Sequence, residues 1–362
     1  MTESEKAAAE ASDAALEDFQ RSGRRPTIND IARLSGVSKK TVSRIINLSP
    51  FVKDETRERV MKVIDALAYM PDLQARGLAF RRSFLIGLIY NNPSAQYVID
   101  MQQGILDAVR GSGYELVVHP CDLSNPNFLK DVRAFVERQK LFGVIMPPSV
   151  SEDEALAQLL AEIECPYVRI ASVSLDRNEA MIVTNDRNGA AEAARHLADL
   201  GHKRIAFVSG PTSFRSSHER REGFAAGLAE KGLKLAADDV VFGAYTFESG
   251  VECGAALLKR KPRPTAIFCG NDEMAAGVYR AARDAGFEIP RDLSVVGYDD
   301  SPVAAKVWPP LTTVKLPIRE MGRLAAEKLL SGAVEGFTGR VIDAKVAPAL
   351  VVRESTAKPA GR

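Results

Sequence analysis

The sequence predicts a small all-α unit at the N-terminus, followed by a larger α/β body of two doubly wound lobes with parallel sheets. Three observations lead to this fold class. The chain has 362 residues, of which 46% are hydrophobic and 26% are charged, enough for two or three folded domains. Residues 21–82 carry fourteen basic and six acidic side chains, although the whole chain has a net charge of only +1. After residue 82, strands begin to alternate with helices.

Composition excludes several classes of protein. The chain has no run of about 18 uncharged apolar residues, so we expect no membrane span. The first 20 residues hold six acids and one lysine without an apolar core, which is unlike a secretory signal, and a cytoplasmic location is expected. The four cysteines lack metal or redox spacing and are predicted to be buried thiols: Cys121, Cys165, Cys253 and Cys269.

The sequence also argues against an enzyme, a metal site or a nucleotide cofactor. The four histidines show no metal-ligand spacing: His119, His196, His202 and His218. Residues 111–113 lack the third glycine of a dinucleotide-binding loop, and no Walker-type lysine motif occurs. Ser217 and His218 are adjacent, so their side chains would point apart on a helix and could not form a catalytic pair.

Residues 1–25 are rich in Ala, Glu and Ser, with little bulky apolar content, and are expected to form a disordered or weakly helical tail. Residues 26–71 then predict three short helices with apolar stripes. The signals that begin or end these helices are the capping-box pair Thr27 and Asp30, the turn glycine Gly36, the cap Ser38 and, for the third helix, Asp54.

The second of these helices is basic, and we predict that it binds DNA. Two helices separated by a glycine turn form a helix-turn-helix. Val42 and Ile45 face inward, whereas the exposed positions are Ser38, Lys39, Lys40, Thr41, Ser43 and Arg44. Lys and Arg can donate hydrogen bonds to guanine in the major groove, and hydroxyls can reach phosphates. The alternative is a small helical bundle with a solvated basic face.

Residues 72–82 are predicted to be a linker with marginal helical propensity. Beyond them, apolar strands alternate with amphipathic helices, which is typical of parallel sheets covered on both faces. The predicted strands are 84–90, 116–119, 143–146, 167–171, 181–184, 204–209, 239–245, 266–269 and 293–297. The predicted helices include 97–110, 188–200, 217–231, 247–258 and 272–285. Polar residues follow several strands, so a ligand cleft is expected at the carboxyl ends of the strands.

Several motifs resemble the LacI/GalR family of repressors. Residues 26–47 resemble the family's N-terminal DNA-binding signature, and residues 67–71 and 75–78 resemble its hinge region. The similarity continues through residues 201–206, 270–272, 296–300 and 310–314. It extends over about residues 26–355 and implies a periplasmic-binding-protein-like body behind the DNA-binding unit.

The resemblance implies the following organisation. Residues 26–71 form the helix-turn-helix domain, and residues 72–82 form a hinge helix. Residues 83–355 form an effector-binding and dimerisation domain of two lobes, in which the chain crosses between lobes near residues 184, 312 and 340. Residues 356–362 are expected to form a flexible tail.

The resemblance also assigns DNA-contacting roles by position. The implied base-reading residues are Lys39, Lys40 and Arg44. The implied residues that position the DNA backbone are Thr27, Ser38, Thr41, Ser43, Asn47 and Tyr69. The implied hinge helix includes Ala75, Arg76 and Leu78, and Leu78 matches the leucine that wedges into a central base step. The alternative is an ordinary linker with Leu78 packed on the body.

A small-molecule effector is implied in the cleft. By position, its binding residues are Asn91, Tyr97, Arg220, Phe247, Asn271 and Asp299. Polar groups around an aromatic ring suit a sugar, so a mono- or oligosaccharide, or a phosphorylated derivative, is expected. Phe214 stands where the purine-responsive branch has an arginine, which disfavours a purine, although Arg215 is adjacent. The alternatives are that Phe247 belongs to the core and that Arg220 and Asp299 form an internal ion pair.

The sequence therefore predicts a homodimeric repressor of carbohydrate-utilisation genes that binds a near-palindromic operator in double-stranded DNA and is released by a sugar inducer. No zipper-like extension follows Arg353, which favours a dimer over a tetramer. Four alternatives remain open: a corepressor-dependent regulator, an activator, a regulator that needs a phosphocarrier protein, and, in a different class, a solute-binding module.

Overall fold

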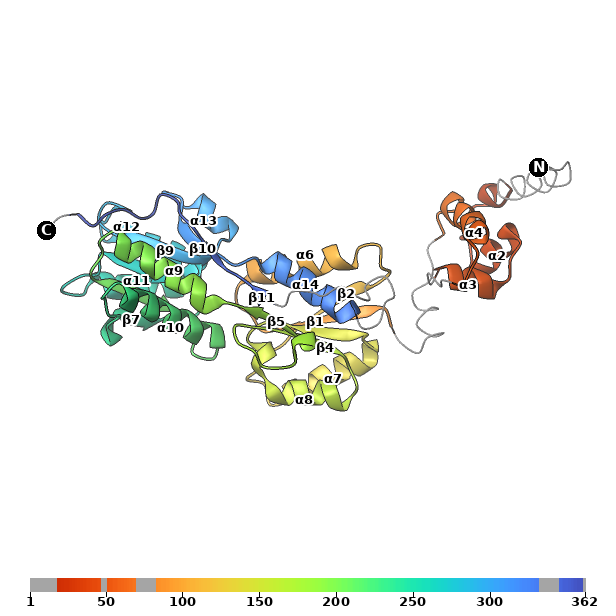
Figure 1. The fold of residues 1–362 in the computed structure, drawn as a ribbon, viewed down its shortest axis with the longest axis horizontal. Coiled ribbons are helices and arrows are strands. Elements are labelled where there is room, and N and C mark those ends of the chain that lie inside the picture. Colours follow the sequence, from red (N-terminus) through yellow and green to blue (C-terminus); the bar gives the residue numbers. More distant parts are fainter. Residues whose placement is uncertain (1–17, 47–50, 70–82, 332–344, 361–362) are drawn as a thin grey trace. The chain divides into compact units, whose positions relative to one another are not determined.

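The computed structural model describes four stretches of the chain: residues 18–46, 51–69, 83–331 and 345–360. The chain folds as two compact units, Met1–Ser83 and Phe84–Arg362 (Figure 1). Four residues with predicted DNA-contacting roles lie outside the described residues: Asn47, Ala75, Arg76 and Leu78.

In the described part of the N-terminal unit, a small apolar core is surrounded by α2 (Ile28–Ser35), α3 (Lys39–Ile46) and α4 (Asp54–Ala66) (Figure 1). Thr27 and Asp30 make the expected capping box, in which Thr27 N donates to Asp30 Oδ2 at 3.1 Å. The Thr27 hydroxyl also donates to this carboxylate and lowers the pKa of Asp30. Gly36 ends α2 at φ +66°, a left-handed conformation that favours glycine. The arrangement confirms the helix-turn-helix prediction.

The described end of the predicted N-terminal tail is helical, as the weakly helical alternative expects. Residues 18–21 are helical, and the Phe19 side chain is only 7% exposed because it packs into the core of the N-terminal unit beside Ile31 and Val60. The overall composition of residues 1–25 is polar and Ala-rich, so one aromatic residue has little influence on a prediction made from composition. That residue is nevertheless enough to hold a short helix when a preformed apolar surface is available.

The second unit consists of two lobes, each built on a six-stranded sheet (Figure 1). The first sheet has the order β11-β5-β4-β3-β1-β2, and its strands pair in parallel. Its strands are β1 (Leu85–Tyr90), β2 (Glu115–Pro120), β3 (Gly143–Met146), β4 (Tyr167–Ala171), β5 (Met181–Thr184) and β11 (Lys345–Val346). Its helices are α6 (Ala95–Val109), α7 (Phe128–Gln139), α8 (Glu154–Glu162) and α14 (Ile318–Ser331).

Helices α6 and α14 pack together on one face of this sheet, and α7 and α8 lie on the other (Figure 1). The α6–α14 contact needs glycine, because a Cβ added to Gly104 would lie 1.9 Å from the carbonyl oxygen of Arg319. Three of these helices, α7, α8 and α14, were not among the helices predicted from the sequence.

The second sheet has the order β12-β10-β9-β8-β6-β7 and is parallel except where β12 joins β10 antiparallel. Its strands are β6 (Ile205–Ser209), β7 (Val240–Phe242), β8 (Ala266–Cys269), β9 (Ser294–Asp299), β10 (Thr312–Lys315) and β12 (Ala349–Val351). Its helices are α9 (Asp186–Asp199), α10 (Arg215–Glu230), α11 (Phe247–Leu258), α12 (Asp272–Asp284) and α13 (Pro302–Lys306). Helices α9 and α10 form one packed pair, and α11 and α12 form another.

The chain passes between the lobes three times. It crosses after β5, again between β10 and α14, and finally between β11 and β12. The third crossing lies at residues 347–348 and not near residue 340, because residues 345–346 still pair with β5 of the first sheet. Polar residues that follow the strands of both lobes therefore face a common space between them.

The C-terminal residues differ from the expected flexible tail. The Thr356 hydroxyl is hydrogen bonded to His196 Nε2 at 2.9 Å, and the carbonyl oxygen of Ala357 lies 2.9 Å from His202 Nε2. Ser355 is fully buried, and its hydroxyl donates to the Val295 carbonyl in β9. Hydrogen bonds to the half-buried His196 and the buried His202 thus hold residues 356 and 357, and desolvation lowers the pKa of both imidazoles.

Candidate functional site

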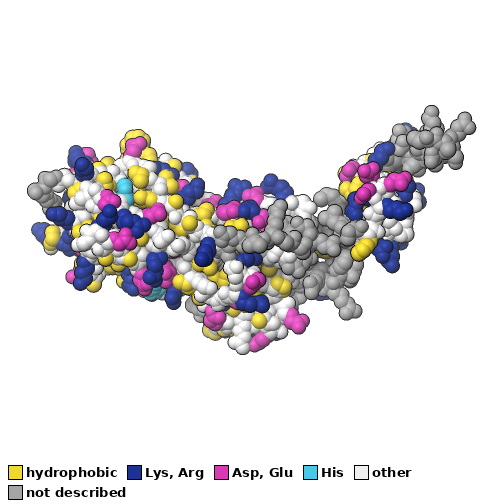
Figure 2. All heavy atoms as spheres, in the orientation of Figure 1, with side chains coloured by type: hydrophobic (Ala, Val, Ile, Leu, Met, Phe, Trp, Pro, Cys, Tyr) yellow, Lys and Arg dark blue, Asp and Glu magenta, His cyan; other side chains and the backbone are white. Residues whose placement is uncertain are grey.

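The basic face of α3 is the first candidate site. Val42 and Ile45 are buried against α2 and α4, which leaves Lys39, Lys40 and Arg44 exposed to solvent. Within the described part of the chain, none of these three cations makes an ion pair. Figure 2 shows lysine and arginine side chains on the surface of this unit. Exposed cations on the second helix of a helix-turn-helix are suited to bind DNA phosphates and bases.

Hydroxyl groups define the start of the same helix. The Ser38 hydroxyl oxygen accepts from Thr41 N at 3.1 Å and lies 2.9 Å from the Thr41 hydroxyl. Ser43 is half-buried, and Tyr69 packs at the edge of the apolar core, where its backbone N–H donates to the Ile64 carbonyl. The hydroxyls of Ser38 and Thr41 therefore organise the first turn of α3 and remain near its exposed face.

A cavity between the two lobes is the second candidate site. It lies at the carboxyl ends of strands from both sheets and has a volume of about 40 Å³. Ligand pockets usually measure roughly 300–1,000 Å³, so a ligand can enter only when the lobes or their side chains move apart. The lining residues are Asn92, Ser94, Tyr97, Pro148, Thr184, Asp186, Phe214, Ser216, Arg220, Tyr245, Asn271, Asp299, Leu316 and Met321.

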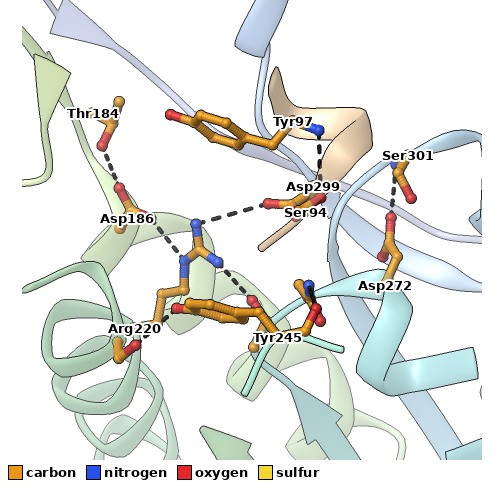
Figure 3. A network of polar contacts seen from close by, with 12 residues as sticks. Ser94, Tyr97, Thr184, Asp186, Arg220, Tyr245, Asp272, Asp299 and Ser301 are labelled. Carbon is orange, nitrogen blue, oxygen red and sulfur yellow. Dashed lines mark hydrogen bonds and ion pairs between the residues drawn. The ribbon is translucent and has the colours of Figure 1, made fainter. Parts of the chain in front are cut away.

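Arg220 on α10 is the centre of a buried polar network (Figure 3). Its Nε donates to Asp186 Oδ1 at 2.8 Å, and its Nη1 donates to the Gly270 carbonyl at 2.5 Å. Its guanidinium carbon lies 3.7 Å from the ring centroid of Tyr298. Thr184 donates a hydrogen bond to the other oxygen of Asp186. The side chains of Arg220 and Asp186 are 7% and 2% exposed, so this ion pair is almost fully desolvated.

Asp299, the last residue of β9, is the second carboxylate near this guanidinium. Its Oδ1 lies 3.8 Å from Arg220 Nη2. Burial raises the pKa of Asp299 to about 7, the charge of Arg220 opposes the rise, and the charge of Asp186 adds to it. The residue also has φ +107°, which is unusual for an aspartate and marks a constrained backbone at the cavity wall.

Two further residues line the cavity with different hydrogen-bonding states. Asn271 is 3% exposed and is already satisfied, because its Oδ1 accepts from Met274 N at 2.9 Å and its Nδ2 donates to the Tyr245 carbonyl at 3.0 Å. The Tyr97 hydroxyl is buried and has no hydrogen-bond partner among the described residues. An unpaired buried hydroxyl is costly, so Tyr97 is a strong candidate to contact a ligand.

Two parts of the sequence match known protein families. Residues 27–72 match bacterial regulatory proteins of the lacI family, and residues 194–356 match the periplasmic binding protein-like domain. The probable HTH-type transcriptional repressor ExuR of Bacillus subtilis (strain 168) is 34% identical over 310 residues, which cover 84% of this chain and 91% of that protein. Catabolite control protein A of Priestia megaterium is 35% identical over 305 residues, with the same coverage. The chain belongs to the LacI family.

Solved structures support the same assignment. The lac repressor dimer bound to operator and the anti-inducer ONPF has a TM-score of 0.73 and 28% identity, and the match covers 92% of this chain and all of that one. The complex of the transcriptional regulator CelR with cellobiose has a TM-score of 0.68 and 30% identity, and the match covers 91% of this chain and 100% of that one. These matches confirm the predicted fold class. As a member of the LacI family, the chain is a transcriptional regulator and not an enzyme.

Two of the six predicted effector residues of this LacI-family chain lie outside the cavity. Asn91 does not line it, whereas its neighbour Asn92 does. The position assigned from the sequence is therefore one residue away from the side chain that lines the cavity. Phe247 begins α11, is 37% exposed and lines a different hollow beside Trp308. Besides Tyr97, the aromatic residues at the cavity are Tyr245 and Phe214.

The other four predicted effector residues come together at the cavity: Tyr97, Arg220, Asn271 and Asp299. Asp186, which the sequence analysis missed, pairs with Arg220 more closely than Asp299 does. It follows strand β5 by two residues, so the rule that polar residues after strands face the cleft would have found it. The internal ion pair that was considered for Arg220 and Asp299 thus exists mainly between Arg220 and Asp186.

Within the described residues, no helix is long and apolar enough to cross a membrane. The same residues contain no group of three or more His, Cys, Asp or Glu side chains that could hold a metal ion.

The raised pKa of Asp299 predicts a pH dependence of folding stability. Between the pKa of an unfolded aspartate, near 3.8, and about 7, the folded protein binds a proton at Asp299 that the unfolded chain does not bind. The contribution of Asp299 to stability therefore increases as the pH falls through about 7, by up to about 1.4 kcal/mol per pH unit. We expect Asp299→Asn to remove this increase.

Urea denaturation of wild type and Asp299→Asn between pH 8 and pH 5 measures the effect. The lowered pKa values of His196 and His202 have the opposite effect on stability. Because of them, the folded protein becomes less stable as the pH falls below about 6.5. The difference between the two proteins cancels this background. If the difference in the free energy of unfolding between wild type and Asp299→Asn stays constant with pH, the raised pKa of Asp299 is contradicted.

Proposed function

We propose that this LacI-family chain is a dimeric repressor of carbohydrate-utilisation genes that binds a near-palindromic operator and is released by a sugar. The observation that carries this proposal is the buried Arg220 network at the wall of an interlobe cavity, in a chain whose first unit presents an exposed basic α3. In this proposal Lys39, Lys40 and Arg44 read bases, and Thr27, Ser38, Thr41 and Ser43 position the DNA backbone. The protein then acts in the cytoplasm, on nucleoid DNA.

The charges at the cavity favour an uncharged effector over a phosphorylated one. Its ionisable lining residues are one cation, Arg220, and two carboxyl groups, Asp186 and Asp299, and the pKa of Asp299 is raised to about 7. The cation is already hydrogen bonded to Asp186 and to the Gly270 carbonyl, so a phosphate would meet the Asp186 carboxylate, and the ionised fraction of Asp299, without a free positive partner. Sugar hydroxyls can donate to a carboxylate and accept from the Tyr97 hydroxyl, while Phe214 and Tyr245 offer ring faces.

The proposal includes coupling between the cavity and the DNA. The cavity of about 40 Å³ must enlarge to admit a sugar, and three chain segments connect the lobes. A sugar that binds one arrangement of the lobes more tightly shifts the protein toward that arrangement. The free energy of DNA binding is then weakened by the coupling free energy between the two sites. Two-fold symmetry of the operator requires two copies of the chain. The 83% exposed Trp308 offers an apolar surface for such a contact.

The proposal is tested on the full chain in two steps. First, an operator is selected from a pool of random duplexes, and the failure of any duplex to enrich would contradict DNA recognition and favour a solute-binding module. Second, neutral sugars and their 6-phosphates are screened by thermal shift, because a ligand of the folded state raises the melting temperature. A stabilising sugar should weaken operator binding in fluorescence anisotropy. Tighter binding would instead indicate a corepressor.

Tyr97→Phe isolates the contact that we assign to the effector. The change removes one hydroxyl that has no partner among the described residues, so the melting temperature without sugar should stay the same or rise. Affinity for the stabilising sugar should fall by about 3- to 10-fold, as expected for one hydrogen bond. Isothermal titration calorimetry measures this change.

Phe247→Ala is the matched control, because Phe247 lies outside the cavity. It should bind the sugar as the wild type does. Equal losses of affinity in the two variants would place the effector elsewhere.

A further inference from the structure

The residues just before the helix-turn-helix form part of the N-terminal unit. We call residues 18–26 the N-terminal arm. The match to the lacI family begins at residue 27, so the family comparison assigns no role to this arm. The arm begins with a helical segment over residues 18–21, whose Phe19 ring is buried in the core formed by α2, α3 and α4.

Specific contacts hold the arm in place. The Gln20 side-chain amide donates to the Ala66 carbonyl at the end of α4, at 2.8 Å. The Ser22 hydroxyl donates to the Phe19 carbonyl at 2.6 Å, which closes the helical segment. Gly23 then takes φ +63° and turns the chain away from the helix axis. The arm is therefore anchored at its start by burial and joined at its end directly to the cap of α2.

The anchored arm carries exposed positive charge next to α2. Arg24 and Arg25 are both exposed, and among the described residues neither makes an ion pair. The guanidinium of Arg24 lies 5.9 Å from the Phe19 ring centroid, and its charge contributes to the lowered pKa of Asp30 in the capping box. Arg25 is only two residues from Thr27, which the proposed function places at the DNA backbone. Two residues span at most about 7 Å, so Arg25 stays beside that contact.

We propose that the N-terminal arm is a second phosphate-binding element of this regulator, in which Arg24 and Arg25 bind the DNA backbone beside the site of α2 and α3. The inference rests on the proposed DNA-binding function. Packing of Phe19 fixes the start of the arm before DNA binds, so less conformational entropy is lost than for a free basic tail. Contacts to phosphates do not depend on sequence, so the arm adds affinity to every duplex.

The expected effect is a change in salt dependence. Each phosphate that a protein neutralises contributes about 0.9 to the slope of log K against log salt concentration. Arg24→Ala/Arg25→Ala should therefore reduce this slope by about 1.8 for each chain bound, and should weaken binding most at low salt. Both side chains are exposed, so the thermal stability of the variant should match that of the wild type.

The experiment measures binding of the full chain to a short duplex of random sequence by fluorescence anisotropy over a series of KCl concentrations. The matched control is Lys130→Ala/Arg138→Ala, which removes two exposed cations from α7 in the other unit. A reduced slope in the arm variant alone supports the inference. An unchanged slope in the arm variant, or an equal reduction in the control, overturns it and leaves the proposed function intact.

Two further results complete the test. Phe19→Ala keeps both arginines but removes the anchor, so its affinity at low salt should lie between those of the wild type and Arg24→Ala/Arg25→Ala. Binding as tight as that of the wild type would show that anchoring does not contribute. A wild-type chain that binds no duplex at any salt concentration would refute the proposed function itself, and the inference with it.

Discussion

Replacing Arg220 by methionine is expected to lower the free energy of unfolding of the two-lobe unit by about 3–5 kcal/mol, the largest loss that we expect from a single substitution. The side chain is 7% exposed and pairs with Asp186, which is 2% exposed, so the change leaves a desolvated carboxylate without its cation. It also removes the hydrogen bond to the Gly270 carbonyl and the contact with the Tyr298 ring. Urea denaturation of the full chain at pH 8 measures the loss.

Two variants separate this cause from a general loss of packing. Arg187→Met removes the neighbouring arginine, which is 52% exposed and pairs with Glu219 and Glu222, so it should cost less than about 1 kcal/mol. Asp186→Asn in the Arg220→Met background removes the buried charge and should restore part of the stability. If the double variant is no more stable than Arg220→Met alone, the unpaired carboxylate is not the cause.

Most of the architecture could be predicted because its strands are buried on both faces and are therefore continuous apolar runs. Strands β3 to β6, β8 and β9 were predicted nearly at their observed bounds. β10, by contrast, reads Thr-Thr-Val-Lys and was predicted only as a crossing between lobes, because its burial comes from neighbours far away in the sequence. The two-residue β11 is too short to give a pattern at all.

The candidate site could be predicted to the level of the strand that supplies each residue, but not always to the residue. Tyr97, Arg220, Asn271 and Asp299 were placed correctly at the cavity. The error between Asn91 and Asn92 is one residue, in the segment that follows β1. Phe247 was assigned as the aromatic contact by its position in the family resemblance, but Tyr245, two residues earlier, has φ +62° and turns its ring toward Ser217 and the cavity. A backbone conformation of this kind has no signature in the local sequence.

Lys39→Ala/Arg44→Ala is expected to abolish operator recognition, with the largest effect on DNA binding of any change proposed for this chain. Each good contact to a base edge contributes about 1–3 kcal/mol of discrimination, so two lost contacts should weaken binding to the selected operator by about 100-fold or more. Both side chains are exposed on α3, while Val42 and Ile45 keep the helix packed. The variant should therefore retain the melting temperature of the wild type.

The comparison between the selected operator and a random duplex separates base reading from nonspecific electrostatic binding to phosphates. Loss of Lys39 and Arg44 should reduce affinity for the operator much more than affinity for the random duplex, because base contacts contribute only to the correct sequence. Lys130→Ala/Arg138→Ala, which removes the same number of charges from α7, should leave the preference for the operator over the random duplex unchanged. If the α3 variant loses affinity equally for both duplexes, its cations bind only phosphates. Base reading must then come from other residues of the helix-turn-helix.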